Sequence, residues 1–509
     1  MQRQHRVIVV GAGFGGVAAA IELQRHGFDD VTLLDAASGI GGTWLHNTYP
    51  GCACDVPSHF YSFSYAQRRD WSRLCSPQEE ILDYLRGVAR DHGIDRRVRA
   101  NTRVESCTWD DATRAWTLTT QDGGSHEADA VVLATGQLHQ PHVPRVRGAD
   151  AFEGHTFHSA RWDHDYDLRG RRVAVIGTGA SAVQFVPEIA EDVERLVVFQ
   201  RTGNWFLPRK NRPYPRAYRW LVEHVPGLQP LRRGFWFWYC EALTYAIRHP
   251  RTLGRFTGAQ SAAFMRVHLR DPELREKVWP TYTFGCKRIL FSSSYLPALQ
   301  RPNVDLVTEP IAGMAADGVV TADGRLHEVD CVIYGTGFRT NDFMFPMRIV
   351  GAGGRDLREE WADGAHAHLG MTIPGFPSLF VMYGPNTNTS GGSIITYLEA
   401  QAGYIRQALD EVRRRDAAAI DVRPEVEAAS DREVQSRFPG TAWTRCDSWY
   451  RDDDAGGRIV ANWPGYMSEY VRRTRELDPA EFGFVPAANG SRALASRSAR
   501  RAGSPSRSR

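Results

Sequence analysis

The stretch FEGHTFHSARWDHDYDLRGRRVAVIGTGASA, residues 152–182, decides the fold of this chain. Its second half is an apolar run over residues 172–176, followed by the turn Gly177-x-Gly179-x-x-Ala182. Such a turn between a strand and a helix lets the backbone approach the pyrophosphate of a dinucleotide. Its first half is a compact His/Trp cluster directly ahead of the strand. The stretch therefore predicts a dinucleotide-binding unit that is entered through a polar and aromatic segment.

A second unit of the same kind opens the chain. The sequence VIVVGAGFGG at residues 7–16 precedes a helix pattern at residues 17–26 and an apolar strand at residues 31–34. The residues expected to hold a dinucleotide here are Gly11, Gly13, Gly16 and Asp35. The glycines suit a pyrophosphate, and the acid at the strand end suits ribose hydroxyls. We therefore predict an α/β protein with two Rossmann-like domains, whose two cofactors face each other.

The two units differ at the ends of their second strands. The strand at residues 195–199 ends in Gln200-Arg201-Thr202 rather than in an acid. A carboxylate would repel a 2′-phosphate, whereas a guanidinium can bind one bidentately. Ala182 in place of the third glycine is also common at NADP sites. The pattern favours NADPH over NADH, and a solvated arginine at a strand end is the alternative.

Composition is that of an ordinary globular protein. The chain has 509 residues, 42% hydrophobic and 24% charged, with a net charge of +3. This length suits two or three domains, and the net charge requires neither nucleic acid nor anionic lipid as a partner. No apolar run reaches 18 residues and the N-terminus lacks a signal-peptide core, so we expect no transmembrane span.

Cysteine spacing is uninformative. The eight cysteines include no C-x-x-C, and Cys52 and Cys54 stand too close for a zinc knuckle. We therefore expect reduced thiols, no metal site and a cytoplasmic enzyme.

The domain plan follows from these patterns. A strand is expected at residues 286–290, another at 329–334, and a long helix at 393–414. The predicted parts are the first dinucleotide-binding domain at 1–145 and 346–486, the second, NADP-type domain at 146–213 and 281–345, a helical aromatic-rich insertion at 214–280, and a disordered tail at 487–509. The insertion could line a substrate channel, dimerise, touch a membrane surface or form ordinary core. The aromatic segment at residues 39–65 is either a structural loop or a wall of the cofactor site.

Two longer patterns identify a family. Phe152-x-Gly154-x-x-x-His158-x-x-x-Trp162-Asp163 matches F-x-G-x-x-x-H-x-x-x-W-[P/D] at every fixed position. Residues 41–55 match [A/G]-G-x-W-x-x-x-x-[F/Y]-P-[G/M]-x-x-x-D, with Gly42, Trp44 and Asp55 at fixed positions. The chain thus resembles the type I (class B) flavoprotein Baeyer–Villiger monooxygenases. Its SWY and NWPG segments, residues 448–450 and 462–465, are similar to the branch that includes hydroxyacetophenone monooxygenase.

This resemblance implies a role for each site residue. FAD would be held by Gly11, Gly13, Gly16, Asp35 and Gly42, with Trp44 and Asp55 beside the flavin ring. NADPH would be held by Gly177, Gly179 and Ala182, with Arg201, Thr202 and Lys287 at its 2′-phosphate and Trp449 on the nicotinamide side. Arg288 matches the family's active-site arginine, which Asp55 would hold in place. The motif residues Phe152, Gly154, His158 and Trp162 would couple domain rotation to cofactor position; a structural histidine at a domain linker is the alternative.

The resemblance also implies the reaction. NADPH would reduce FAD, O2 would form a C4a-peroxyflavin, and one oxygen would be inserted beside a ketone carbonyl to give an ester or lactone. Oxygenation of nitrogen or sulfur is the nearest alternative. A disulfide reductase would need a redox-active cysteine pair, and a non-catalytic flavin-binding partner would use the insertion as an interface. The sequence leaves the ketone and the oligomeric state open.

Overall fold

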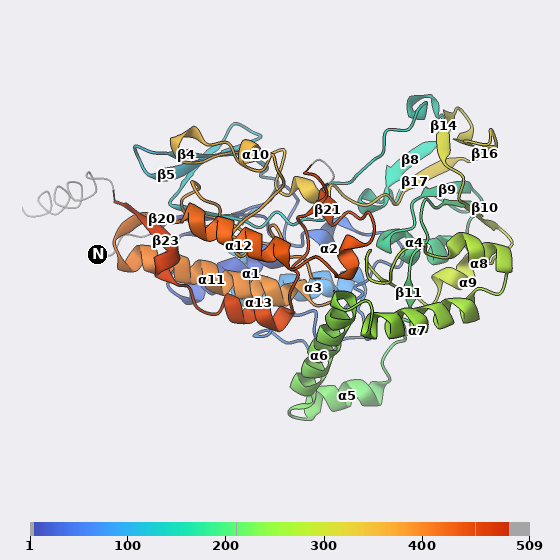
Figure 1. Cartoon of the computed structure of the whole chain (residues 1–509), viewed down its shortest axis with the longest axis horizontal. Helices are drawn as coiled ribbons and strands as arrows, with labels where there is room; N and C mark the ends of the chain where they lie inside the picture. The colour runs from blue at the N-terminus through green and yellow to red at the C-terminus, as the bar shows by residue number, and fades with distance from the viewer. Residues whose placement is uncertain (1–4, 210, 390, 453–454, 488–509) are drawn as a thin grey trace, which may run out of the picture.

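Two parallel sheets with the same internal order organise the chain. The computed structural model describes residues 5–209, 211–389, 391–452 and 455–487, so the predicted disordered tail lies outside the described residues from position 488 onward. The predicted pair of Rossmann-like domains is confirmed, and the two halves lie side by side in Figure 1.

The first sheet takes its strands from both ends of the chain. Its order is β19 (Leu379–Val381), β7 (Ala130–Leu133), β1 (Val7–Val10), β2 (Val31–Leu34) and β3 (Val98–Arg99). Every pairing in it is parallel. Strands β1 and β7 are fully buried apolar runs, as expected for strands covered on both faces.

The second sheet is built entirely from the middle of the chain. Its order is β13 (Val304–Val307), β10 (Arg195–Phe199), β9 (Arg172–Ile176), β17 (Cys331–Tyr334) and β8 (His155–His158). All its pairings are parallel too. One continuous cluster of buried side chains runs through both sheets and includes Val9 and Val175. The two halves are therefore joined by core as well as by chain.

Each half contains the same two further features, a helix after its glycine turn and a small antiparallel sheet. The helix after each glycine turn is α1 (Phe14–Arg25) in the first half and α4 (Ala180–Ile189) in the second. Three antiparallel strands precede an inner strand in each half: β4 (Val104–Asp110), β5 (Ala115–Thr120) and β6 (Ser125–Ala128) before β7, and β14 (Ile311–Ala315), β15 (Gly318–Thr321) and β16 (Leu326–Glu328) before β17. Strand β18 (Arg348–Val350) joins the first of these sheets by pairing parallel with β4.

The remaining elements cover and connect these halves. Helix α11 (Ile394–Arg414) packs along α1 (Figure 1). The short connecting elements are α2 (Thr43–His46), α3 (Gln78–Asp91), β11 (Phe206–Leu207), β12 (Leu290–Phe291), α9 (Tyr295–Ala298) and α10 (Leu357–Glu360). The C-terminal elements are β20 (Ala417–Val422), α12 (Pro424–Ser436), β21 (Arg451–Asp452), β22 (Arg458–Ile459), α13 (Met467–Arg473) and β23 (Phe482–Pro486).

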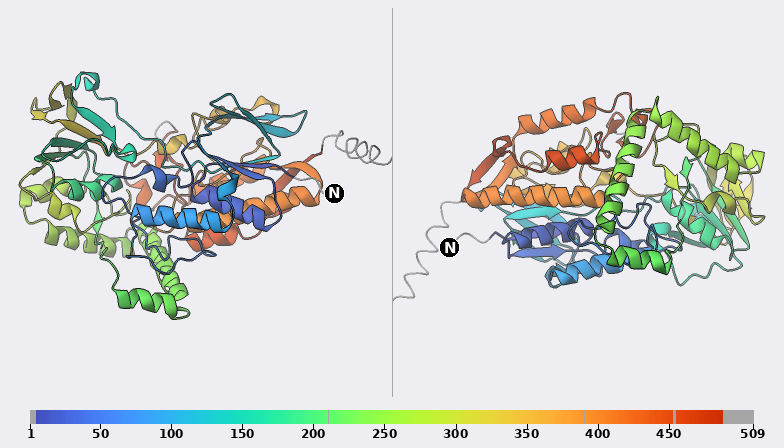
Figure 2. Two further views of the ribbon diagram at one scale, coloured as in Figure 1. Left: turned by 180° about the vertical axis from the view of Figure 1, so that it is seen from behind. Right: turned by 90° about the horizontal axis from the view of Figure 1, so that it is seen from below.

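The region predicted as a helical insertion contains four helices. They are α5 (Arg216–His224), α6 (Leu228–Arg248), α7 (Leu253–His268) and α8 (Pro272–Val278). Helices α5 and α6 form a hairpin that projects away from both sheets, which is visible in Figure 1 and from behind in Figure 2. Among the described residues, no helix is long and apolar enough to cross a membrane.

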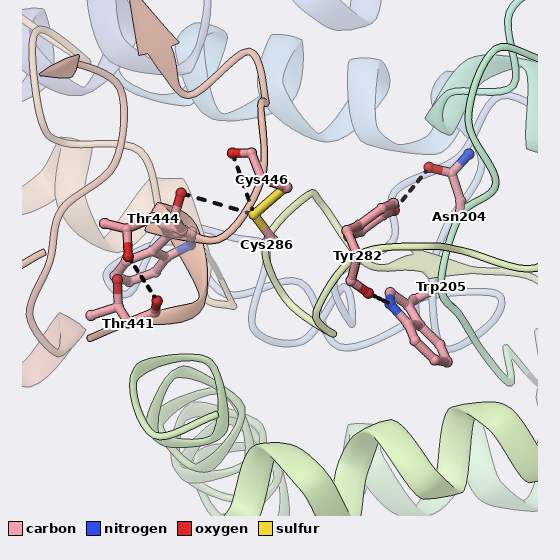
Figure 3. Close-up of a disulfide and its surroundings, with 8 residues drawn as sticks. Asn204, Trp205, Tyr282, Cys286, Thr441, Thr444 and Cys446 are labelled. Atoms are coloured by element: carbon pink, nitrogen blue, oxygen red, sulfur yellow. Dashed lines mark hydrogen bonds between the residues drawn. A yellow bond between two sulfur atoms is a disulfide. The ribbon is translucent and has the colours of Figure 1, made fainter. Parts of the chain in front are cut away.

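One prediction about the cysteines is wrong. Cys286 and Cys446 form a disulfide across 160 residues of sequence (Figure 3). Motif spacing could not reveal this pair, because folding alone brings the segment before β12 beside the segment before β21. The remaining six cysteines are free and buried. The prediction of a cytoplasmic location therefore loses its support from reduced thiols.

Candidate active site

A cavity of about 670 Å³ lies where the first sheet's strands end and the second half begins. This volume is in the range of small-molecule and cofactor sites. Its wall includes Gly11, Gly13 and Asp35 from the first turn, Ala134 from the end of β7, and Ser181 from the start of α4. The cavity is thus shared between the two dinucleotide units.

The first turn has the geometry that a pyrophosphate requires. Gly11 has φ +111°, and a side chain on it would place Cβ 2.3 Å from the carbonyl oxygen of Ala134. At Gly16 a Cβ would lie 1.9 Å from the carbonyl oxygen of Gly11. The turn is therefore packed against β7 with no room for side chains at these positions, and α1 points its first amides at the cavity.

Asp35 is fixed by the backbone of the same turn. One carboxylate oxygen accepts a 2.6 Å hydrogen bond from the Ala12 amide and the other a 2.7 Å bond from the Ala37 amide. A carboxylate has about four lone-pair sites, so acceptor capacity remains for hydroxyls. Asp35 thus fits a ribose at this end of the cavity.

The aromatic segment at residues 39–65 contributes a wall of the cavity, which decides the alternative that its sequence leaves open. Gly42 lies against the Cα of Gly13, where an added Cβ would stand 2.9 Å away. Trp44 is buried in the wall and its Nε1 donates to the Tyr61 hydroxyl at 3.2 Å. The segment therefore backs the glycine turn and forms the surface beside it.

Asp55 and Arg288 form an ion pair in the cavity wall. Nη2 of Arg288 donates to Oδ2 of Asp55 at 2.5 Å, although the two residues are 233 positions apart. The Arg288 side chain is 40% exposed, and it lines the cavity. The pair brings a charged group from each half of the chain to one point.

Each member of this ion pair shifts the pKa of the other and so keeps it charged. The carboxylate of Asp55 raises the pKa of the Arg288 guanidinium further above its ordinary value. Burial alone would raise the pKa of Asp55, but the charge of Arg288 outweighs it and the pKa lies below its ordinary value. Both groups are therefore charged at neutral pH, with the guanidinium as a permanent cation facing the cavity.

The second turn repeats the backbone of the first. Gly177 has φ +104°, and a Cβ on it would lie 2.5 Å from the carbonyl oxygen of Gly335 at the end of β17. Gly179 precedes the first residue of α4, and Ala182 is fully buried in its first turn. These three residues lie outside the cavity wall, whereas Ala180, Ser181 and Gln184 line it.

Two cations lie together beyond the end of β10. Arg201 is exposed, and Thr202 and Lys287 are half-buried. Burial and the positive charge of Arg201 lower the pKa of Lys287, and the negative charge of Asp447 opposes this. Among the described residues neither one has a carboxylate within ion-pair distance. The two cations are a fit for a phosphate group.

The His/Trp motif packs inside the second half. His158, on β8, is buried, and its Nδ1 accepts a 3.0 Å hydrogen bond from the Ala160 amide. Burial lowers the pKa of His158 to about 4, so the ring is neutral at physiological pH. Trp162 packs edge-on against Phe185 of α4, with ring centroids 5.2 Å apart.

The other motif positions have structural contacts as well. A Cβ on Gly154 would stand 2.3 Å from the ring of Phe152 and 2.7 Å from the carbonyl oxygen of Asp330. None of the four motif residues lines the cavity. Trp449 also lies outside the cavity wall, with its ring 4.3 Å from that of Tyr450.

Several site residues carry no signal in the sequence. Gln184 of α4 exchanges hydrogen bonds with the backbone of Ala53, at 2.9 Å and 3.1 Å, and so fastens α4 to the aromatic segment. Arg209 donates to the carbonyl oxygen of Cys54 at 2.8 Å, next to Asp55. These are side chain to backbone bonds across the domain boundary, which no local motif reveals.

The cysteines near the cavity do not form a redox pair. Cys52 and Cys54 line the wall as free thiols. Burial raises the pKa of Cys52 to about 12 and that of Cys54 well above its ordinary value, so neither is a thiolate. In the Cys286–Cys446 disulfide, Cys286 is buried and Cys446 is half-buried, and neither lines the cavity. No described cysteine pair is therefore placed for disulfide reduction at the cavity.

Known proteins resemble this chain over nearly its full length. Residues 8–216 match the pyridine nucleotide-disulphide oxidoreductase family. A Baeyer–Villiger monooxygenase of Streptomyces coelicolor is 44% identical over 96% of this chain and 95% of its own. A solved steroid monooxygenase bound to NADP is 31% identical, with a TM-score of 0.83 over 95% of this chain and 99% of its own. The complex of OTEMO with FAD and NADP is 25% identical, with a TM-score of 0.86 over 95% and 100% of the two chains.

Proposed function

The chain belongs to the Baeyer–Villiger monooxygenases and is an FAD-dependent NADPH monooxygenase; we propose that its substrate is a ketone, beside whose carbonyl it inserts one oxygen atom. The product is an ester or a lactone. The observation that carries this proposal is the Asp55–Arg288 ion pair in the cavity wall.

Each dinucleotide unit binds one cofactor. FAD is held by the turn of Gly11, Gly13 and Gly16, with Asp35 at the ribose and Gly42 and Trp44 along the other wall. NADPH is held by Gly177, Gly179 and Ala182, with Arg201, Thr202 and Lys287 at its 2′-phosphate and Trp449 towards the nicotinamide. When bound, the two cofactors supply hydride transfer and the activation of O2.

Arg288 supplies the charge that oxygenation requires. Negative charge develops on oxygen during the activation of O2, and a fixed cation in a site shielded from water stabilises it. With its pKa raised by Asp55, the guanidinium does not donate its proton and acts as a positive charge and hydrogen-bond donor. Asp55 orients Arg288 through the 2.5 Å bond and balances its charge.

The His/Trp motif positions the NADPH half. His158 is neutral and Trp162 packs on α4, the helix that contributes Ser181 to the cavity. Motion of β8 would therefore be transmitted to the cavity wall through α4. This supports a role for Phe152, Gly154, His158 and Trp162 in coupling domain position to cofactor position rather than in acid–base chemistry.

The test is a panel of linear, cyclic and aryl ketones, each incubated with the purified holoenzyme, NADPH and O2. We expect a product one oxygen heavier than at least one ketone, with an ester or lactone carbonyl. Aryl sulfides and amines serve as the comparison panel. Oxygenation of these heteroatoms with no reaction of any ketone would overturn the proposal in favour of a heteroatom oxygenase.

A further inference from the structure

The α5–α6 hairpin exposes apolar side chains where a surface helix is normally polar. On α6, Leu231 is 70% exposed, Phe235 61% and Trp238 67%. Their spacing of four and three residues puts them on one face of the helix. Helix α5 adds Trp220, which is 57% exposed, and Leu221 at 43%. The three side chains on α6 define the apolar face of the hairpin, and the two on α5 add exposed apolar surface on the adjoining helix.

The opposite face of α6 already packs on the protein. Arg233 donates to the carbonyl oxygens of Phe60 and Ser62, and Phe237 packs edge-on against Phe60. Cys240 and Leu243 are buried on the same side. The helix is therefore anchored by its inner face, and the chain's own folding leaves the outer apolar face uncovered. Such a face on a folded chain marks an interaction site.

The charge around this face identifies its partner. Residues 211–270 contain ten arginines and only two glutamates, so this segment carries +8 in a chain whose net charge is +3. Arg212, Arg216 and Arg219 are exposed at the start of the hairpin. The rest of the chain is therefore net acidic, and six of the ten arginines, at positions 212, 216, 219, 232, 233 and 248, belong to the hairpin or to the segment that leads into it.

We propose that the α5–α6 hairpin docks on the surface of an anionic lipid bilayer. Trp and Phe side chains enter the boundary between headgroups and acyl chains, and exposed arginines contact the lipid phosphates. Tryptophan favours this boundary because its ring is apolar and its N–H is polar. The hairpin projects from the body of the molecule, so the sheets do not hinder its approach to a flat surface (Figures 1 and 2).

A second copy of the chain fits this face less well. Pairing by a two-fold axis would set the same basic segment of one copy against that of the other. Like charges brought together in this way oppose association. Anionic headgroups instead complement the charge and the apolar side chains together.

The test is co-sedimentation of the FAD-loaded enzyme with vesicles. We expect binding to vesicles of phosphatidylcholine with phosphatidylglycerol, weak binding to phosphatidylcholine alone, and loss of binding in high salt. The double variant Phe235→Ser/Trp238→Ser should bind at least about tenfold more weakly, and Arg216→Gln/Arg219→Gln should weaken binding to the anionic vesicles. Val143→Ser, an exposed apolar side chain far from the hairpin in sequence, is the matched control and should bind as the wild type does.

Three results would overturn the proposal. The first is wild-type enzyme that stays in the supernatant with both vesicle compositions, and the second is a Phe235→Ser/Trp238→Ser variant that binds as tightly as the wild type. The third is a wild-type dimer, detected by light scattering, that the double variant converts to monomer without any vesicle binding; the face would then join two copies. NADPH oxidation by each variant shows that it is folded, since none of these residues contacts the cavity.

Discussion

The two glycine turns of this molecule have the same backbone conformation but different side chains at the ends of the neighbouring strands. Gly11 and Gly177 have φ of +111° and +104°, and each packs against the carbonyl oxygen that follows a neighbouring strand, Ala134 in one half and Gly335 in the other. The second strand of the first unit ends in Asp35, whose oxygens are held by backbone amides. The second strand of the other unit leads to the exposed cation Arg201.

The turn and the side chain at the strand end therefore have different roles in binding. In the proposed assignment, the glycine turn binds the pyrophosphate, and the side chain at the strand end distinguishes a free ribose hydroxyl from a 2′-phosphate. The Lys287–Arg288 pair stands between the halves, with Lys287 beside Arg201 and Arg288 bonded to Asp55. The following predictions test how independent the two halves are.

The largest effect is expected from the third position of the first turn. Gly16→Ala places a Cβ 1.9 Å from the carbonyl oxygen of Gly11, so the turn cannot form without moving α1. We expect purified Gly16→Ala protein to lack FAD, measured as flavin absorbance per mole of protein. Ala182→Gly is the matched control in the other half; it should keep its FAD and lose at most about 1 kcal/mol of stability. Full FAD content in Gly16→Ala would show that the first turn is not the flavin site.

The disulfide beside the Lys287–Arg288 pair is expected to stabilise both halves. Because it closes a loop of 160 residues, removing it through Cys286→Ser/Cys446→Ser should cost about 2–5 kcal/mol in the free energy of unfolding. Urea unfolding with and without reductant measures this. Reductant should lower the midpoint of the wild type and leave that of the double variant unchanged. A wild-type midpoint insensitive to reductant would contradict the prediction.

The strand-end cation should control cofactor choice only in the second half. Arg201→Ala would remove the charged hydrogen bond that we propose to the 2′-phosphate, so the ratio of kcat/KM for NADPH to that for NADH should fall by about 10–100-fold. The control is Arg195→Ala, at the start of the same strand and paired with Asp305 at 2.7 Å, which should leave the ratio unchanged. An unchanged ratio in Arg201→Ala would remove this residue from the 2′-phosphate site.

The smallest effect concerns one histidine in each half, the half-buried His46 and the buried His158. Burial lowers the pKa of His46 and of His158 to about 4. The unfolded chain takes up these protons near pH 6.5 but the folded chain does not, so this part of the stability is complete above pH 6.5 and declines as the pH falls towards 4. The melting temperature should drop less over this interval in His158→Gln than in the wild type. Parallel curves would show that His158 ionises normally in the folded protein.

The sequence predicts the sheet centres well. Strands β9, β10 and β2 begin and end at the predicted residues, because strands buried in the middle of a sheet are short apolar runs with sharp ends. The strand expected at residues 286–290 is mostly a loop, and only Leu290 joins β12. Its position depends on the disulfide and the bond to Asp55, which are contacts between residues far apart in sequence.

The sequence predicts the separate motifs of the site but not the contacts that bring them together. Two turns, a terminal acid and a terminal cation are local patterns, and the structure places them in the expected order along two sheets. The meeting of Asp55 with Arg288 follows from family resemblance only. The contacts of Gln184 and Arg209 across the boundary have no pattern in the sequence, because each is a single side chain bound to backbone of the other half.

The most direct test of the account is rapid mixing of the Arg288→Ala enzyme, first with NADPH and then with O2 and a ketone that the wild type oxygenates. NADPH should still bleach the flavin absorbance within a few-fold of the wild-type rate, since neither dinucleotide turn is altered. Ester or lactone formation should fall by about 10²–10³-fold or more, with NADPH consumed without product. Ester formation at the wild-type rate would show that oxygenation does not require the positive charge of Arg288 in the cavity wall.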